Sequence, residues 1–164
     1  MKYVYIGKFE GTHGLKGEIK FKTDFKYINR VLSKSFSFFI EDSKEKLSLN
    51  TYRKFKEGYL VSFANLENID LIKKYVNKKV YVLRDDLNLE TGQYVFEDFI
   101  DCECFFDKKS LGKVVDIIDA GASNYIFYIQ GEKEVLIPLN EHFIDRIESD
   151  KIYFKNVEGL IDAN

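Results

Sequence analysis

The stretch Gly11-Thr12-His13-Gly14-Leu15-Lys16-Gly17-Glu18 lies between two short runs, 2–9 and 18–25, in which apolar and polar residues alternate. Such alternation is typical of β-strands, so the stretch is predicted to connect two strands. Three of its residues are glycine. Glycine adopts positive φ freely and allows a close approach of backbone or ligand, so the sequence predicts a connection with a demanding conformation.

The same stretch carries groups that suit an oxyanion or phosphate ligand. It combines the imidazole of His13, the ammonium of Lys16 and backbone N–H groups with little side-chain cover. The alternative is a tight connection in which the glycines only satisfy geometry. No Gly-Lys-Ser or Gly-Lys-Thr occurs here, which excludes a nucleotide P-loop. The candidate binding residues are Gly11, Thr12, His13, Gly14, Leu15, Lys16, Gly17, Lys20 and Lys22.

Composition is typical of a globular protein without a membrane segment. With 164 residues, 45% of them hydrophobic, the chain has room for one ordinary domain or two small ones. No apolar run approaches the roughly 18 residues of a membrane span. The first residues, Met1-Lys2-Tyr3-Val4-Tyr5, lack the pattern of a secretory signal. We therefore expect a cytoplasmic protein with no membrane partner.

Cys102 and Cys104 lie two residues apart in a predicted strand, where their side chains share a face and a mutual disulfide is disfavoured. The chain contains only two histidines, which falls short of a convincing four-ligand zinc set. We expect both thiols in buried or half-buried apolar positions, with no metal and no cofactor.

Charge is distributed unevenly between the two halves. Residues 1–84 contain 18 basic and 9 acidic residues, a balance of +9, and residues 85–164 contain 7 and 18, a balance of −11. Such asymmetry predicts a different partner for each half, with nucleic acid expected for the basic one. The alternative is two solvated surfaces of opposite sign that attract each other.

The first half has the pattern of a small β-barrel. A helix capped by Asn65 or Asn68 and stopped at Asn77 is predicted from an apolar stripe at helical spacing. Strands are predicted at 2–9, 18–25, 35–40, 47–55, 59–63 and 79–83. The last strand is expected to close a six-stranded barrel that the helix plugs at one end.

Residues 85–92 are polar and turn-rich, and the charge changes sign there, so they are the predicted linker between domains at 1–84 and 93–164. A helical turn is expected at 140–146. The second domain is again predicted to be β, with strands at 101–106, 112–118, 125–130, 134–138 and 152–155.

Several separate motifs in this order resemble the RimM family of ribosome maturation factors. The stretch 11–18 is similar to the N-terminal motif of that family, and residues 68–83 resemble the helix and strand that close its first barrel. The second half is similar to a PRC-type barrel at 112–116, 121–122, 134–138 and 158–160. The resemblance implies a mostly β protein with a translation-factor-like six-stranded barrel, one short helix and a C-terminal PRC-type barrel.

One position departs from the family pattern. The family opens its second barrel with two adjacent tyrosines, another aromatic residue and, further on, a glycine. The matching residues here are Tyr94, Val95, Phe96, Asp98 and Asp101, so the second tyrosine and the glycine are lost. If the aromatic pair is a contact surface, this chain makes it with Tyr94 and Phe96 alone, and these two residues are the predicted protein-partner surface.

The resemblance implies a monomeric, non-enzymatic assembly factor that binds the immature 30S small ribosomal subunit near its head. It would help 16S rRNA and a basic head protein, the nineteenth of the small-subunit set, to reach their final arrangement, and it would leave the mature particle. Charge separation suggests a clamp, with the basic barrel on phosphates and the acidic barrel on the basic protein.

Three alternatives follow from the residues themselves. The first is an RNA-acting enzyme that uses His13 and nearby carboxylates, although no nucleophile or carboxylate pair accompanies a second histidine in either half. The second is a barrel that binds a flavin or nucleotide at the 11–18 stretch. The third is a plain protein-interaction module, which differs from the favoured hypothesis only in the role of the basic half. For His13 itself, a phosphate contact and a hydrogen bond to a carbonyl that fixes the loop are equally open.

Overall fold

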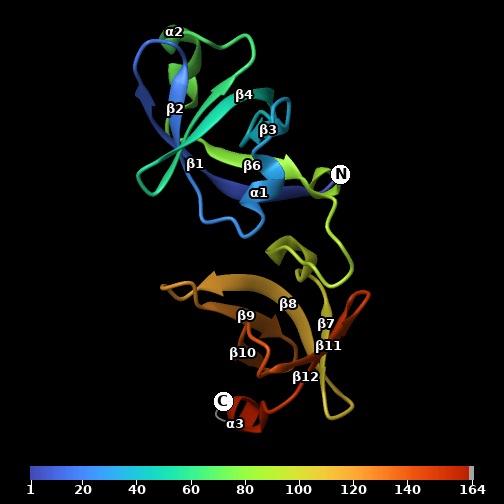
Figure 1. Ribbon diagram of the computed structural model, residues 1–164. Coiled ribbons are helices and arrows are strands. Elements are labelled where there is room, and N and C mark those ends of the chain that lie inside the picture. Colours follow the sequence, from blue (N-terminus) through green and yellow to red (C-terminus); the bar gives the residue numbers. More distant parts are fainter. Residues whose placement is uncertain (163–164) are drawn as a thin grey trace. The chain divides into compact units, whose positions relative to one another are not determined.

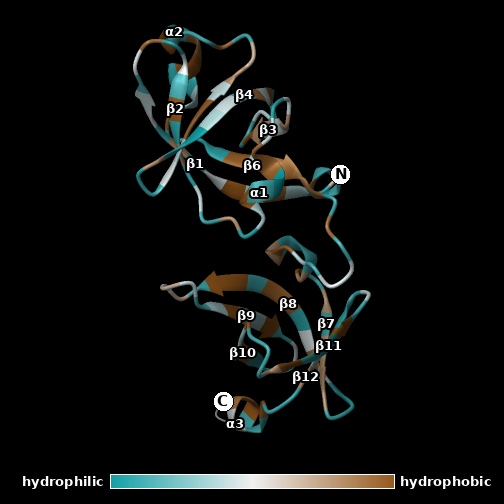
Figure 2. Ribbon diagram, viewed as in Figure 1, coloured by the Kyte–Doolittle hydropathy of each residue, from teal (hydrophilic) through white to brown (hydrophobic). Residues whose placement is uncertain are grey.

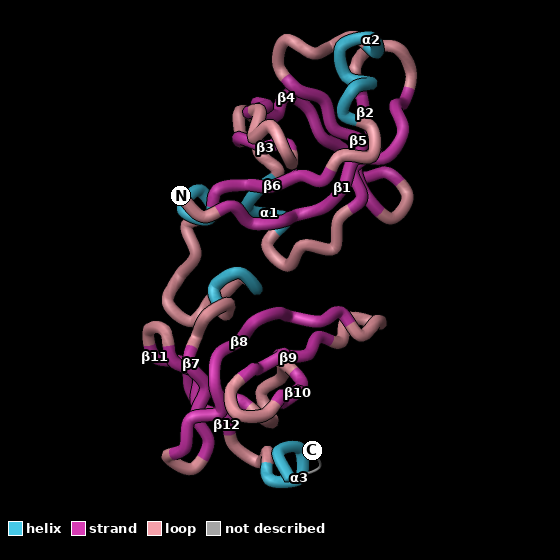
Figure 3. The backbone as a smooth tube through the Cα atoms, turned by 180° about the vertical axis from the view of Figure 1, so that it is seen from behind, coloured by secondary structure: helices cyan, strands magenta, loops and turns pink. Residues whose placement is uncertain are grey.

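The computed structural model describes residues 1–162, which form two compact units, the first from Met1 to Gln93 and the second from Tyr94 onward. Strands dominate both units, and the helices are short (Figures 1 and 3). No helix among the described residues is long and apolar enough to cross a membrane. The prediction of a mostly β chain is therefore confirmed.

Six antiparallel strands of the first unit close into a barrel in the order β1-β2-β5-β4-β3-β6. Closure is made by β6, which pairs with both β1 and β3. The predicted six-stranded barrel is therefore confirmed. Its strands are β1 (Tyr3–His13), β2 (Glu18–Lys22), β3 (Ser37–Ile40), β4 (Lys46–Phe55), β5 (Gly58–Phe63) and β6 (Lys79–Leu83).

Four phenylalanine rings from different strands fill the barrel interior. Phe9 contacts Phe21 and Phe63, and Phe38 contacts the same two rings, so the four form a closed cycle with centroid separations of 5.3 to 5.8 Å. None of the four is more than 1% exposed. Every pair is edge-on, a geometry worth about 0.5–1.5 kcal/mol per pair beyond the burial of apolar area. Figure 2 shows both apolar and polar segments along the strands of this barrel.

The predicted helix is present but shorter than its apolar stripe. It consists of α2 (Ile69–Ile72) followed by a 3-10 turn, η1 (Lys73–Tyr75). Asn68 is the cap, because its Oδ1 accepts a hydrogen bond of 2.7 Å from the Asp70 N–H. Asn77 has a φ of +68°, as expected for a left-handed stop. A second short helix, α1 (Ile28–Val31), was not predicted, since four residues carry no helical period.

The segment predicted as a linker, 85–92, is attached to the first unit. It begins in the 3-10 helix η2 (Arg84–Leu87), whose Leu87 side chain is buried. Arg30 Nη1 donates to the carbonyl oxygens of Leu87 and Asn88, at 3.3 and 2.7 Å. Arg30 Nη2 donates to Gln93 Oε1 at 3.2 Å and lies 3.6 Å from a Glu90 carboxylate oxygen. We call this set of contacts the Arg30 latch.

The second unit has one six-stranded sheet in the order β10-β9-β8-β7-β12-β11. Its strands are antiparallel except β12 and β7, which pair in parallel with Ile152 opposite Cys104. A 3-10 helix, η3 (Phe96–Asp98), precedes the sheet and α3 (Glu158–Asp162) follows it. The strands are β7 (Glu103–Phe106), β8 (Lys109–Asp119), β9 (Tyr125–Gln130), β10 (Glu134–Pro138), β11 (Ile144–Glu148) and β12 (Lys151–Phe154).

Two details of the second unit differ from the prediction. The helical turn expected at 140–146 is limited to its first residues, where the Phe143 and Ile144 N–H groups donate to the Asn140 carbonyl. Residues from Ile144 onward form β11, because they pair with β12. Cys102 and Cys104 are both buried in the core of this unit, as expected.

Candidate functional site

The glycine-rich stretch is a hairpin whose turn is shorter than predicted. Gly11, Thr12 and His13 belong to β1, with a register irregularity between Phe9 and Thr12. His13 is paired with Glu18 on β2, so only residues 14–17 form the turn. The prediction that β1 ends at Phe9 is therefore wrong, because pairing with β2 continues the strand through Gly11.

The turn is fixed to the start of α2 through backbone contacts. The Ile69 N–H donates to the Leu15 carbonyl at 3.0 Å. Gly17 has a φ of +86°, and a Cβ added there would lie 2.3 Å from the Leu66 carbonyl oxygen and 2.8 Å from the Asn68 nitrogen. A side chain at position 17 would therefore separate the turn from the helix. At this position the glycine allows close packing of the turn against the helix, which agrees with the alternative that the glycines satisfy geometry.

Only part of the predicted binding set converges. Leu15 and Lys16 are exposed at the turn, and Leu15 is 75% exposed. His13 and Lys20 instead meet at the ring of Phe55, with a His13–Phe55 centroid separation of 5.2 Å and Lys20 Nζ 6.0 Å from the ring centroid. Among residues 1–162, the contact that positions the imidazole is this ring, and no carbonyl accepts a hydrogen bond from it.

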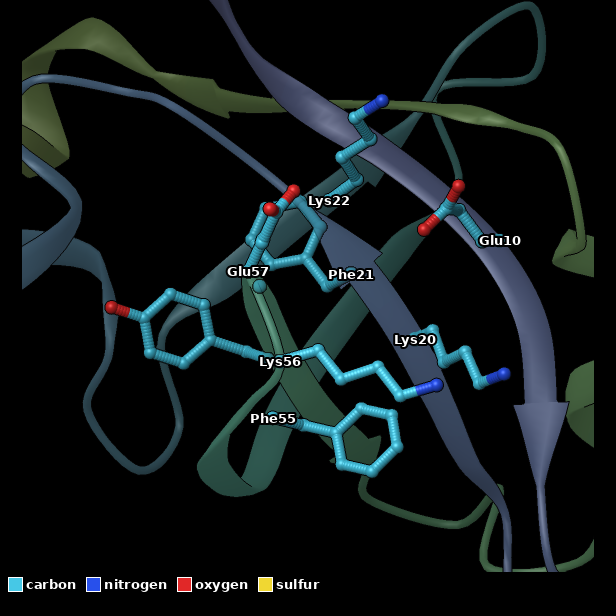
Figure 4. A pocket seen from close by; sticks show the side chains of 9 residues that line it. Glu10, Lys20, Phe21, Lys22, Phe55, Lys56 and Glu57 are labelled. Carbon is cyan, nitrogen blue, oxygen red and sulfur yellow. The ribbon is translucent and has the colours of Figure 1, made fainter.

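A hollow of about 390 Å³ lies beside Phe55, between the outer end of β2 and the turn that joins β4 to β5 (Figure 4). We call it the Phe55 hollow. Two of the predicted residues, Lys20 and Lys22, line it. The other lining residues are Glu10, Phe21, Phe55, Lys56, Glu57, Gly58 and Tyr59.

The residues of the 55–59 turn escaped the sequence-based prediction. Phe55 and Tyr59 were placed at the ends of the strands predicted at 47–55 and 59–63, and no binding role was predicted for residues 55–59. The available signal was Phe55 followed directly by Lys56, an aromatic and a cationic residue at a hairpin end. Its meaning depends on β2 lying alongside, which a local pattern does not reveal.

Charges at this end of the barrel are partly neutralised. Arg53 donates two hydrogen bonds to the carboxylate of Glu18, and this contact is the main cause that lowers the pKa of Glu18 below its usual value. The two charges therefore cancel at neutral pH. No carboxylate among the described residues forms an ion pair with Lys20, Lys22 or Lys56. These three lysines, together with Lys16 in the turn, therefore supply positive charge near the hairpin.

The two aromatic residues predicted as a protein-partner surface have different environments. Tyr94 packs against the core, with its ring centroid 5.7 Å from that of buried Phe99. Phe96 is 39% exposed, and its ring centroid lies 4.5 Å from that of Tyr125 on β9. The neighbour that accompanies Phe96 at the surface is thus Tyr125, which the sequence did not single out.

The sign of the charge follows the two structural units. The first unit, residues 1–93, has 18 basic and 12 acidic residues, a net charge of +6. The second, from residue 94, has 7 basic and 15 acidic residues, a net charge of −8.

The two histidines lie in different units, His13 in the first and His142 in the second. Within residues 1–162, no group of three or more His, Cys, Asp or Glu side chains is placed to hold a metal ion.

Comparison with known protein families assigns both units. Residues 4–87 match the RimM N-terminal domain, and residues 96–160 match the RimM PRC barrel domain. The chain belongs to the RimM family. Both RimM matches fall within the two units described above, so the second unit is a PRC barrel domain of this family.

Bacterial relatives match almost the whole chain. A ribosome maturation factor RimM from an Exiguobacterium species is 31% identical over 99% of this chain and 98% of its own length. The RimM of Bacillus subtilis is also 31% identical, over 98% of each chain. A crystal structure of a RimM 16S ribosomal RNA processing protein from Pseudomonas aeruginosa is 14% identical, covers 94% of this chain and 97% of its own, and has a TM-score of 0.47.

Proposed function

We propose that this protein is a ribosome assembly factor that binds the immature 30S subunit near its head and assists the maturation of that subunit and the processing of 16S rRNA. It acts without catalysis or a cofactor, as a monomer in the cytoplasm, and leaves before the particle is mature. The observation that carries the proposal is membership of the RimM family along nearly the whole chain. The relatives at 31% identity are named ribosome maturation factors.

The separation of charge supports two different contacts on the particle. The first unit, at +6, is suited to rRNA phosphates, and the second unit, at −8, is suited to a basic ribosomal protein. We propose the nineteenth small-subunit protein, in the head, as that partner. The candidate protein surface is Phe96 with Tyr125, since exposed aromatic residues are frequent anchors of protein interfaces.

On the first unit, the proposed rRNA contacts extend the predicted set. Lys20, Lys22 and His13 lie on or beside the Phe55 hollow, and Leu15 and Lys16 stand exposed at the β1–β2 turn. Gly11, Thr12, Gly14 and Gly17 shape the hairpin that presents them.

Co-sedimentation of the whole protein with immature small subunits, mature small subunits and complete ribosomes tests the proposal. We expect strong binding to immature or free small subunits and little binding to complete ribosomes. Equal binding to all particles would reduce the protein to a general polyanion binder. An absence of binding to any particle would refute the assembly role.

A salt series in the same assay tests the electrostatic part. Because contacts between lysine and phosphate release counterions, binding should weaken steeply as the salt concentration rises. An affinity that stays constant across the series would contradict phosphate binding by the first unit, even if selectivity for small subunits held.

A further inference from the structure

The Phe55 hollow depends on a close approach between the β4–β5 turn and β2. Gly58 is paired with Phe55 across the β4–β5 turn, and a Cβ added to Gly58 would lie 2.4 Å from the Phe21 carbonyl oxygen. The absence of a side chain at position 58 therefore lets the turn approach β2 closely. This approach sets Phe55 and Lys56 beside Lys20 (Figure 4).

The ring of Phe55 is held among positive or polar groups and not in the core. It is half-buried, it makes a T-shaped contact with the His13 ring, and its centroid lies 5.4 Å from Lys56 Nζ and 6.0 Å from Lys20 Nζ. Unlike the four core phenylalanines, it remains partly accessible to solvent. An exposed aromatic face surrounded by ammonium groups is the arrangement that proteins use to bind single-stranded nucleic acid.

The charged residues that line the Phe55 hollow favour a nucleotide ligand over a simple phosphate. Lys20, Lys22 and Lys56 supply positive charge, whereas Glu10 and Glu57 supply carboxylate acceptors. Carboxylates repel a phosphate but accept hydrogen bonds from the exocyclic amino groups of bases. A ligand with both a flat base and flanking phosphates uses all of these groups.

We propose that the Phe55 hollow binds an unpaired RNA nucleotide, with its base stacked on Phe55 and the neighbouring phosphates held by Lys20 and Lys56. The inference rests on the proposed function for its choice of RNA, because that function requires contact with rRNA. It adds a site, a binding mode and a preference for unpaired strands. Stacking is available only to a base that is free of its duplex neighbours, so a continuous helix cannot use the ring.

Fluorescence anisotropy of the full-length protein with a labelled single-stranded RNA 12-mer, and with the same sequence closed into a duplex, tests the inference. We expect the single strand to bind more tightly. Phe55→Leu should weaken its binding about tenfold, within the range measured for loss of one base-aromatic stack. Phe55→Tyr, which keeps a ring, should bind as the unaltered protein does.

Matched variants separate the site from general effects. Tyr52→Leu removes an exposed ring from the same strand, and Lys46→Gln removes an exposed lysine from its other end. Both should leave binding unchanged. Lys20→Gln and Lys56→Gln should each reduce the slope of log affinity against log salt by about 0.7. Circular dichroism of each variant checks that the barrel is intact.

Several outcomes would overturn the inference. Equal binding of the single strand by Phe55→Leu and the unaltered protein excludes stacking, and a preference for duplex excludes the proposed binding mode. Binding of a labelled polyglutamate peptide that depends on Phe55, without RNA binding, would assign the hollow to an acidic protein segment.

Co-sedimentation distinguishes failure here from failure of the proposed function. If the protein binds small subunits but Phe55→Leu binds RNA as tightly as the unaltered protein, the assembly role is supported and the nucleotide site is refuted. If RNA binding depends on Phe55 but the protein does not bind small subunits, the nucleotide site is supported and the assembly role is refuted.

Discussion

The carboxylate of Glu18 on β2 accepts two hydrogen bonds of 3.1 Å from Arg53 on β4, one from Nε and one from Nη2. These strands are not neighbours, because β5 lies between them in the barrel. The pair therefore ties three strands together at the end of the hairpin. A forked contact of this kind has a defined geometry that a single lysine contact lacks.

Acidification should remove the contribution of this pair. Arg53 lowers the pKa of Glu18 in the folded state, so the ionised form stabilises the fold above the unfolded pKa of Glu18 and stops doing so as the pH falls through the lowered value. Glu18→Gln should unfold at a lower urea concentration than the unaltered protein at pH 7, and the difference should shrink as the pH falls below the ordinary pKa of a glutamate. A difference that stays constant as the pH is lowered would mean that the contact does not depend on the charge of Glu18.

Replacement of Gly17 should destabilise the first unit more than replacement of Gly14. Both have positive φ, but a Cβ meets the Leu66 carbonyl oxygen at position 17 and nothing within 4 Å at position 14. We expect Gly14→Ala to cost about 1 kcal/mol, from backbone strain alone. Gly17→Ala should cost about 2 kcal/mol or more, since strain and a backbone clash add. Hydrogen exchange at the slowest amides of β1 and β2 measures both, and equal values would contradict the clash.

The thiol of Cys104 should be unreactive in the folded protein. Burial is the main cause that raises its pKa to about 12, and its side chain is 0% exposed. At pH 8 the reactive thiolate is therefore almost absent. Iodoacetamide should modify neither Cys104 nor buried Cys102 until urea unfolds the second unit. An added exposed thiol, Thr91→Cys, is the control for reagent activity, and rapid native labelling of Cys104 would contradict the packing described.

Loss of the Arg30 latch should release residues 84–93 without disturbing the barrel. Arg30→Ala removes the donor to the Leu87 and Asn88 carbonyls and the partner of Glu90. Cleavage at Glu90 by a glutamate-specific protease should become several-fold faster. Lys34→Ala, which removes a nearby exposed cation, is the matched control and should be cleaved at the original rate. Equal rates for all three proteins would show that other contacts hold this segment.

Substitution of Tyr94 should mainly affect the stability of the second unit, and substitution of Phe96 should mainly affect partner binding. Because Tyr94 packs on buried Phe99, Tyr94→Ala should destabilise the second unit by about 1–3 kcal/mol. Phe96→Ala should leave stability nearly unchanged and weaken co-sedimentation with small subunits about tenfold or more, as expected for an interface anchor. Hydrogen exchange and co-sedimentation of both variants give the two readouts. Normal co-sedimentation of Phe96→Ala would remove this residue from the partner surface.

Local chemistry explains what the sequence could predict. Asn68 and Asn77 mark the ends of the helical region, because a cap and a left-handed stop depend on neighbouring residues only. The alternating strands were recognisable for the same reason. In contrast, α1 has only four residues, too few to express a helical period, and the start of β11 was included in the helical turn expected at 140–146.

The candidate site was only partly predictable because it depends on contacts between distant segments. Lys20 and Lys22 were identified from their place beside the glycine stretch, but Phe55 and Lys56 reach them through barrel pairing. The Arg30 latch is likewise non-local, since Arg30 and Asn88 are 58 residues apart. The residues predicted as a linker are polar and turn-rich, and this pattern does not reveal a contact with the guanidinium of a distant arginine.

The parallel pairing of β7 with β12 has a consequence for the order in which the chain folds during translation. The first barrel has all its strands once β6 has been synthesised, so it can close while the rest of the chain is still being made. The second sheet has to wait, because β12 lies between β7 and β11 and is the last strand to leave the ribosome. A nascent chain that stops before Lys151 therefore keeps a closed first barrel but leaves one edge of β7 unpaired, open to aggregation and to proteases.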